Sequence, residues 1–291
     1  MFYSPLRYPG GKKRLAEFIA KICVDNNIDG HYIEPYAGGA SVALYLLFQN
    51  RVKKITINDF DKAIYAFWYC VVHYTEDFCN LIEKTDITIS NWNKAKDVQK
   101  KKDQISLSAK KQVLELGFST FFLNRTNRSG IINAGVIGGL EQKGNYKIDC
   151  RFNKIDLIKR IRLIAQFRER IILENLDAIE LIKKVNKQEN TSNYIFYFDP
   201  PYYVHGPGLY LNSYLDIDHV KVADEIKNID DCYWIISYDN TERINELYSW
   251  VEKKVEFTLT HSINKSRKGK EILFFSNKIV KIDLDPIQKY I

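Results

Sequence analysis

The chain has 291 residues, a length that suits two domains or one large domain with an insertion. Its composition, 45% hydrophobic and 27% charged, is that of a globular protein and excludes collagen-like, fibrous and disordered chains. The charge of +7 favours an anionic partner without identifying it. The longest uncharged stretches, such as 63–72, are shorter than the roughly 18 apolar residues that a membrane-spanning helix needs.

The N-terminal residues become basic at Lys12 without an apolar segment before it, which is not the pattern of a signal peptide. The five cysteines are scattered and contain no Cys-x-x-Cys pair, so they fit neither a disulfide framework nor a zinc site. We therefore expect a cytoplasmic protein with reduced thiols and no membrane partner.

Short apolar runs alternate with segments of helical spacing along much of the chain. We expect strands at 31–36, 53–58, 170–176, 193–198, 233–238 and 271–276. We expect helices at 12–24, 40–49, 218–227 and 241–248. This alternation predicts an α/β fold with a mostly parallel sheet. The last two strands, at 254–262 and 270–277, have no helix between them and predict a terminal antiparallel hairpin.

The alternation stops after Asp61 and resumes near Arg170. The interval is polar, lysine-dense and rich in helical spacing, so we interpret 62–169 as an inserted domain. Residues 1–61 and 170–291 would then form the sheet domain. Within the insert, a glycine-rich stretch at 135–144 predicts a long loop or hairpin.

The tetrapeptide Asp199-Pro200-Pro201-Tyr202 follows directly on an apolar strand. A rigid turn at a strand end, capped by the aspartate and packed on the tyrosine, would be a purely structural explanation. The same residues also suit methylation of an exocyclic amine on a nucleic-acid base, a reaction that requires no metal. The lone pair of adenine N6 or cytosine N4 is delocalised into the ring until two acceptors draw its N–H groups toward tetrahedral geometry.

The Asp199 carboxylate and the Pro200 carbonyl can supply those two acceptors, while the prolines remove competing N–H donors and fix the backbone. Tyr202 would stack on the base, which a methyltransferase must flip out of a duplex to reach. This chemistry leaves adenine and cytosine equally open.

Residues 34–41 read Glu-Pro-Tyr-Ala-Gly-Gly-Ala-Ser and connect an expected strand to an expected helix. Glycines let the backbone approach a ligand closely, and a helix start offers free N–H groups. Asp59 closes the next strand about 20 residues on, where nucleotide-binding folds place an acid on ribose hydroxyls. A helix N-cap is an equal alternative for Asp59.

A third motif at residues 7–12 reads Arg-Tyr-Pro-Gly-Gly-Lys and taken alone would be a flexible start before a helix. Together, the three motifs resemble the DNA adenine N6-methyltransferases of the alpha class, the D12 class that includes bacterial DNA adenine methylases. The similarity of motif order runs from Tyr8 to about Asn277. It implies a Rossmann-like S-adenosylmethionine-dependent methyltransferase sheet with a C-terminal antiparallel hairpin, and it makes the insert the helical target-recognition domain.

The resemblance also implies roles for individual residues. The catalytic set is Asp199, Pro200, Pro201 and Tyr202. The contacts to S-adenosylmethionine carry over to Tyr8, Gly10, Gly11, Lys12, Ala37, Gly38, Gly39, Ser41, Asp59 and Asp199. A looser match at 174–177 implies that Asn175, Leu176 and Asp177 contact the adenine ring of the cofactor.

Three departures from the family pattern concern these motifs. Tyr8 stands where relatives often carry Trp, and the glycine turn reads Tyr-Ala-Gly-Gly-Ala-Ser where the family pattern is Phe-x-Gly-x-Gly. Both changes keep an aromatic face or small residues where they are needed. In the insert, 122–126 resembles the family, but the residues that follow do not match the pattern of GATC methylases. The target sequence therefore stays open.

For DNA contacts we favour Arg125, Asn127 and Arg128, since arginine reads guanine bidentately and asparagine reads adenine. A polar turn that touches only phosphates is the alternative. The lysines of 94–102 and the basic residues of 265–270 could bind phosphates or be solvated surfaces. The loop 203–214 could close over a flipped base, and we assign its His205 no catalytic role.

The sequence thus predicts a site-specific methyltransferase that modifies adenine N6 in double-stranded DNA by base flipping. A cognate restriction endonuclease or another defence-system protein is a candidate partner. A cytosine N4 or RNA adenine methyltransferase is the nearest alternative. A non-catalytic DNA-binding subunit of a restriction or defence system is the alternative from another class.

Overall fold

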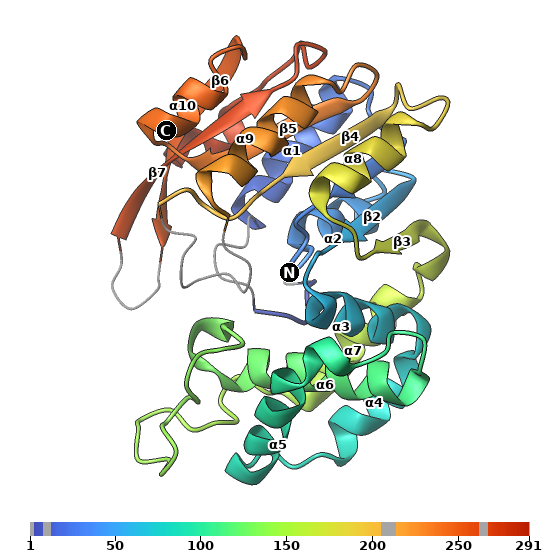
Figure 1. Cartoon of the computed structure of the whole chain (residues 1–291), viewed down its shortest axis with the longest axis vertical. Coiled ribbons are helices and arrows are strands. Elements are labelled where there is room, and N and C mark those ends of the chain that lie inside the picture. The colour runs from blue at the N-terminus through green and yellow to red at the C-terminus, as the bar shows by residue number, and fades with distance from the viewer. Residues whose placement is uncertain (1–2, 8–12, 205–213, 262–266, 291) are drawn as a thin grey trace. The chain divides into compact units, whose positions relative to one another are not determined.

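The computed structural model describes residues 3–7, 13–204, 214–261 and 267–290 (Figure 1). Contacts between Cα atoms divide the chain into two units, which we describe separately. The first unit comprises residues 1–11 and 60–175, and the second comprises 12–59 and 176–291. The described N-terminal residues 3–7, which we had expected in the sheet domain, thus group with the insert. That 62–169 is an inserted domain, with boundaries at 61/62 and 169/170, stays a prediction.

The strands form a mixed seven-stranded sheet in the order β3-β2-β1-β4-β5-β7-β6. Strand β1 pairs in parallel with β2 and with β4, β4 pairs in parallel with β5, and β7 is antiparallel to both β5 and β6. The predicted α/β sheet with a C-terminal antiparallel hairpin is therefore confirmed. The strand bounds are β1 (His31–Glu34), β2 (Lys54–Asn58), β3 (Ile171–Glu174), β4 (Tyr194–Phe198), β5 (Tyr233–Asp239), β6 (Lys253–His261) and β7 (Arg267–Phe275).

Helices cover both faces of the sheet in the second unit (Figure 1). Apolar residues of α8 (Ala178–Asn186), α9 (Asp216–Lys227) and α10 (Glu242–Leu247) pack on one face, in a core that includes Phe196, Phe198 and Phe274. Neighbouring strand residues point to opposite faces. Phe275 therefore belongs to the other face, where it contacts Phe18 of α1 (Lys13–Asp25) with ring centroids 6.2 Å apart. Helix α1 in turn packs on α2 (Ser41–Phe48).

The first unit is mainly helical, as its sequence pattern predicted. Its helices are α3 (Lys62–His73), α4 (Thr75–Lys84), α5 (Ile89–Lys100), α6 (Lys110–Thr126) and α7 (Lys154–Ala165). Aromatic rings form much of its core, with Phe121 contacting Phe67, Phe78 and Phe152 at centroid separations of 5.9, 5.7 and 5.3 Å. Residues 131–153 form turns with one isolated bridge, between Asn127 and Val136, so the glycine-rich stretch is a long loop.

Within the described ranges, none of the helices combines the length and the apolar character that a membrane span requires. All five cysteines are free; four are buried and Cys150 is exposed.

Candidate active site

The predicted site residues of the second unit gather at one edge of the sheet. The glycine turn follows β1, Asp59 follows β2, and Asp199 follows β4. Because β1 pairs in parallel with both β2 and β4, these strands end at the same edge. In the order β2-β1-β4, the strand that follows β1 in the chain lies on one side of it and β4 lies on the other side. Ligands of open α/β sheets bind outside the carboxyl ends of the strands at such a switch point.

The glycine turn after β1 is held by the end of β2. The Ala37 N–H donates to the Asn58 carbonyl at 2.9 Å, and the Gly38 N–H donates to Asp59 Oδ2 at 2.9 Å. Gly38 and Ala40 have φ values of 47° and 46°, a left-handed conformation that is strained for the alanine. The chain therefore turns sharply into α2, whose first residue is Ser41. Asp59, expected on a ribose, also orders this turn.

Asn58 joins three segments of the site, and sequence reasoning had not assigned it a role. Its side-chain amide donates to the carbonyls of Pro35 at 2.8 Å and Leu176 at 3.0 Å, and its Oδ1 accepts from the Leu176 N–H at 2.9 Å. Because Asn58 is fully buried, these bonds fix Leu176 against the end of β1. Leu176 is thus brought to the predicted cofactor turn.

The two neighbours of Leu176 have structural partners of their own. Asp177 Oδ1 accepts from the Ile179 N–H at 2.9 Å and caps α8. Asn175 belongs to the first unit, where its side-chain amide donates to the Phe60 carbonyl at 3.1 Å. Their expected contacts with the cofactor adenine stay predictions.

Glu34 places a buried carboxyl group at the end of β1. Its Oε1 accepts from the Tyr32 hydroxyl at 2.8 Å and from the Ala43 N–H of α2 at 3.1 Å. Its Oε2 is buried and accepts no hydrogen bond from the described residues. Burial, and secondarily the charge of Asp199, raise the pKa of Glu34 to about 8. The group is therefore mostly protonated at neutral pH.

The tetrapeptide 199–202 is held by two residues of the neighbouring strand β5. Ser237 Oγ donates to Asp199 Oδ1 at 3.0 Å. Asp239 accepts the next two backbone N–H groups with one oxygen each, from Tyr203 and from Val204, both at 2.9 Å. Sequence reasoning missed both residues, and the acid at the end of the predicted strand 233–238 was the available signal. Strand β5 thus fixes the tetrapeptide at both of its ends.

Polar contacts also hold the chain on either side of residues 205–213. The Tyr36 and Tyr214 hydroxyls are 2.8 Å apart. Asp216 accepts from the Tyr203 hydroxyl at 3.1 Å and from two nitrogens of Arg243 at 2.8 and 2.9 Å. The Arg243 guanidinium is the main reason that the pKa of Asp216 falls to about 2.

Several predicted positions lie outside the described residues. They are Tyr8, Gly10, Gly11 and Lys12 of the N-terminal motif, His205 with most of its loop, and Lys265 of the hairpin tip.

Asn127 and Arg125 of the first unit, two of the residues favoured for DNA contact, have internal partners. Asn127 is fully buried; its Oδ1 accepts from the Trp92 indole at 2.6 Å, and its amide donates to the carbonyls of Ile131 and Ile132. Its side chain therefore builds the turn and is not available to a base in this arrangement. Arg125 lies in the last turn of α6 and is half-buried, where its Nε donates to the Arg151 carbonyl at 2.7 Å.

Arg128 is the exposed member of the three. Its backbone N–H donates to the Gly135 carbonyl at 3.0 Å, and a Cβ added at Gly135 would lie 3.6 Å from its guanidinium. The side chain therefore extends along the glycine-rich loop with its charge exposed to solvent.

Arg125 belongs to a group of arginines that sequence reasoning did not anticipate. Burial lowers its pKa to about 10, and the positive charges of Arg7, Arg160 and Arg151 add to this effect. The pKa of Arg7 is lowered by burial and by Arg151. We call Arg7, Arg125, Arg151 and Arg160 the arginine cluster. The Asp156 carboxylate pairs with Arg160 at 2.6 Å, so the cluster keeps an excess of positive charge that favours an anionic partner.

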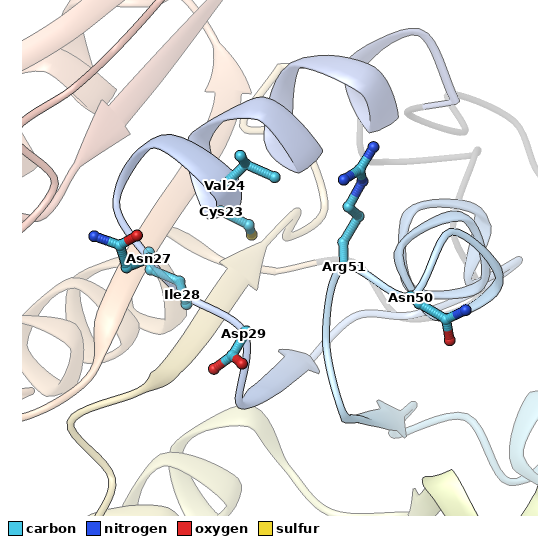
Figure 2. Close-up of a pocket in the computed structure, with 7 residues that line it drawn as sticks. All are labelled: Cys23, Val24, Asn27, Ile28, Asp29, Asn50 and Arg51. Carbon is cyan, nitrogen blue, oxygen red and sulfur yellow. The ribbon is translucent and has the colours of Figure 1, made fainter.

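A pocket lies at the opposite edge of the sheet (Figure 2). Its lining comes from the end of α1, the turn that precedes β1, and the turn between α2 and β2: Cys23, Val24, Asn27, Ile28, Asp29, Asn50 and Arg51. These turns lead into the amino ends of β1 and β2. The pocket is therefore separate from the candidate site at the carboxyl ends of the strands.

Two known proteins are similar to this chain. The type II methyltransferase M.MjaIII of Methanocaldococcus jannaschii is 24% identical over 252 residues, which cover 77% of this chain and 79% of that protein. Among solved structures, the rRNA methyltransferase aviRa from Streptomyces viridochromogenes matches with a TM-score of 0.37 and 9% identity, over 94% of this chain and 88% of that one.

Residues 8–263 match a family model described as D12 class N6 adenine-specific DNA methyltransferase. The matched range contains the glycine turn, Asp59 and the tetrapeptide at 199–202. This chain therefore belongs to the D12 class of N6 adenine-specific DNA methyltransferases.

Proposed function

We propose that this protein uses S-adenosylmethionine to methylate adenine N6 at specific sites of double-stranded DNA, on a base flipped out of the helix. The observation that carries the proposal is the position of Asp199 and Pro200. They follow β4 directly, next to the glycine turn that follows the adjacent strand β1. Acceptors for the amine and a turn suited to a nucleotide-like cofactor therefore lie at the same edge of one sheet.

The residues at this edge fit S-adenosylmethionine. The left-handed backbone at Gly38 and Ala40 opens the start of α2 toward a ligand. The buried Glu34 Oε2, which has no hydrogen-bond partner among the described residues, marks a polar position at the end of β1. We propose that the glycine turn, Asp59 and Leu176 hold the cofactor. When bound, S-adenosylmethionine supplies an electrophilic methyl group.

The chain's own residues prepare the N6 amine. Asp199 and the Pro200 carbonyl accept its two N–H groups, which localises the lone pair on nitrogen and directs it at the methyl donor. The Asp199 carboxylate then stabilises the positive charge that develops on N6 as the N–C bond forms. The bond between the methyl carbon and the donor's sulfur breaks in the same step, and the extra N6 proton then passes to solvent. In the described structure the Tyr202 side chain is only 6% exposed. A flipped base could therefore reach only a small part of this residue for stacking.

We propose that the first unit binds the DNA. Arg128 is the residue best exposed for contact with a base edge, since its guanidinium can bind guanine bidentately. The arginine cluster would hold backbone phosphates, which position a protein on DNA without reading sequence. Asn127 supports Arg128 by fixing the turn that carries it.

The chain's similarity to a type II methyltransferase supports a role in restriction and modification. We propose that the methylation is site-specific and that it protects the same sites from a cognate restriction endonuclease. Sequencing of methylated positions in DNA from cells that express the protein would give the site.

Separate measurements of cofactor binding and methyl transfer test the assigned roles. Asp59→Ala should weaken S-adenosylmethionine binding, measured by calorimetry, by about tenfold or more because it removes a ligand contact and an anchor of the turn. Asp199→Asn should keep that affinity within a few-fold but lower single-turnover methyl transfer by about 10²–10³-fold, because the amine loses a charged acceptor.

Asp224→Asn, a neutralised exposed carboxylate on α9, is the matched control and should behave as the wild type. An Asp199→Asn variant with the wild-type transfer rate would contradict the assignment.

A further inference from the structure

Two buried polar side chains, Tyr197 and Ser237, lie on one face of the sheet next to Asp199 of the candidate site. Because strand residues alternate between faces, Tyr197 and Asp199 point away from the face that Phe196 and Phe198 occupy. Strand β5 is paired with β4 so that Ile236 lies beside Phe198. One residue further along, the same register places Ser237 beside Asp199.

Hydroxyl groups connect these two side chains to the catalytic carboxylate. Ser237 Oγ lies 3.0 Å from Asp199 Oδ1 and 3.0 Å from the Tyr197 hydroxyl. Ser237 is fully buried, and Tyr197 is 3% exposed. The Phe198 carbonyl oxygen is a more distant acceptor, 3.5 Å from Ser237 Oγ. An ionised carboxylate can only accept hydrogen bonds, so the single Ser237 proton points to the closer Asp199 and the Tyr197 hydroxyl donates to Ser237.

The tetrapeptide itself explains why Asp199 uses a donor from another strand. An aspartate at a strand end usually accepts from a backbone N–H one or two residues further on. Those residues are here Pro200 and Pro201, which have no N–H. The prolines that keep donors away from the amine site thus also remove the next two backbone N–H groups, which could otherwise help to orient the carboxylate.

We propose that Ser237, supported by Tyr197, is a positioning residue for methyl transfer that fixes the orientation of the Asp199 carboxylate toward the N6 amine. The inference rests on the proposed function of Asp199. A hydrogen bond to an ionised group is stronger than one between neutral groups. A carboxylate held in this way needs no reorientation when the base arrives, which is the advantage of a preorganised site.

Three variants test this role. Ser237→Ala removes the donor, and Tyr197→Phe removes the second hydroxyl while it keeps the ring. Ser276→Ala is the matched control, because Ser276 is a buried serine at the other end of the same sheet region, where its Oγ accepts from the Trp234 N–H at 3.2 Å. Each variant removes one buried hydroxyl group. Only the hydroxyls of Ser237 and Tyr197 belong to the series of hydrogen bonds that reaches Asp199.

Single-turnover methyl transfer on DNA is measured for each variant as a function of pH, together with the affinities for S-adenosylmethionine and DNA. We expect Ser237→Ala to lower the rate constant by about 10- to 100-fold and Tyr197→Phe to lower it by about threefold to tenfold. Both affinities should stay within about threefold, because neither substitution removes a group that binds the substrates before the reaction. The acid limb of the rate profile should move to higher pH in Ser237→Ala, because the ionised carboxylate loses a donor.

The control Ser276→Ala should keep both the rate and the profile of the wild type. Wild-type transfer to adenine is established first, because its absence would overturn the proposed function and this inference with it. If the wild type is active, transfer rates and pH profiles in Ser237→Ala and Tyr197→Phe that equal those of Ser276→Ala would overturn the inference alone. Tyr197→Phe decides the question if Ser237→Ala does not fold.

Discussion

Two carboxyl groups near the proposed reaction centre have different environments. Asp199 is part-exposed and accepts a hydrogen bond from Ser237, whereas Glu34 is buried and has a pKa of about 8. Sites that must keep one acid charged often hold its neighbour neutral. A protonated Glu34 leaves the negative charge on Asp199, the residue proposed to face the amine.

Glu34 makes the stability of the protein depend on pH. Its pKa is about 8 in the folded protein and near 4.5 in a flexible chain, so the folded state binds the additional proton between these values. The corresponding stability is fully present below about pH 4.5 and is lost as the pH rises to about 8. Glu34→Gln keeps the shape and the acceptor oxygen without the titration.

We expect the free energy of unfolding of Glu34→Gln, relative to the wild type, to rise with pH by up to about 1.4 kcal/mol per unit. Urea unfolding between pH 5 and 9, without cofactor, measures this difference. Asp224→Asn on the surface should run parallel to the wild type. A constant offset between Glu34→Gln and the wild type would contradict the buried, proton-binding role of Glu34.

The sequence allowed prediction of the residues whose signal is local, and it missed those whose roles come from pairing between distant segments. The tetrapeptide at 199–202 carries its chemistry in four adjacent residues. Ser237 and Asp239 act only because β5 lies beside β4, and Asn58 acts because it reaches Pro35 and Leu176. No spacing rule along the chain indicates these contacts.

At the scale of elements, the described N-terminal segment 3–7 is fastened to the helices of the first unit. Asn124 accepts from the Arg7 N–H at 2.7 Å and donates to the Arg7 carbonyl at 2.6 Å. Arg125 and Arg160 donate to the carbonyls of Pro5 and Ser4. These contacts explain why the first residues group with the insert, which their position in the sequence did not indicate.

Gly130 sits at the closest point of this attachment. Its φ is 78°, and a Cβ there would lie 2.3 Å from the Arg7 carbonyl oxygen. Gly139 has a similar φ of 76° with no atom within 4 Å of the added Cβ, so it is a matched control for the backbone strain alone. Comparing alanine substitutions at the two glycines therefore separates the cost of backbone strain from the cost of the steric conflict with Arg7.

We expect Gly139→Ala to lower the free energy of unfolding by about 1–2 kcal/mol, and Gly130→Ala to lower it by clearly more. Gly130→Ala should also speed hydrogen exchange at the Arg7 N–H, because Arg7 must move. Denaturant unfolding and hydrogen exchange measure both effects. Equal losses in the two variants would contradict the close packing at Gly130.

The elements themselves were largely predictable because their apolar spacing is regular. The strands and the four helices expected of the sheet domain appear within a few residues of their predicted ends, apart from the first residues of β7. The spacing of apolar residues does not locate the ends of the helices. Helix α6 continues to Thr126, so Arg125 lies on a helix and Asn127 forms its C-cap, where the composition had indicated a turn.

At the scale of the whole molecule, the two units divide the proposed work. The second carries the glycine turn, Asp59 and the tetrapeptide, and the first carries Arg128 and the arginine cluster. The charge of +7 is modest for a protein that binds DNA. A few arginines concentrated in one unit are sufficient if phosphate contacts position the duplex and a base pocket provides selectivity.

The central claim is that this chain methylates adenine N6 in DNA and that Asp199 is essential for the transfer. Its most direct test is nucleoside analysis by mass spectrometry after the protein has acted on duplex DNA with isotopically labelled S-adenosylmethionine. We predict labelled N6-methyladenine with the wild type, almost none with Asp199→Asn, and no labelled N4-methylcytosine. Label in cytosine, or equal N6-methyladenine from both proteins, would contradict the account.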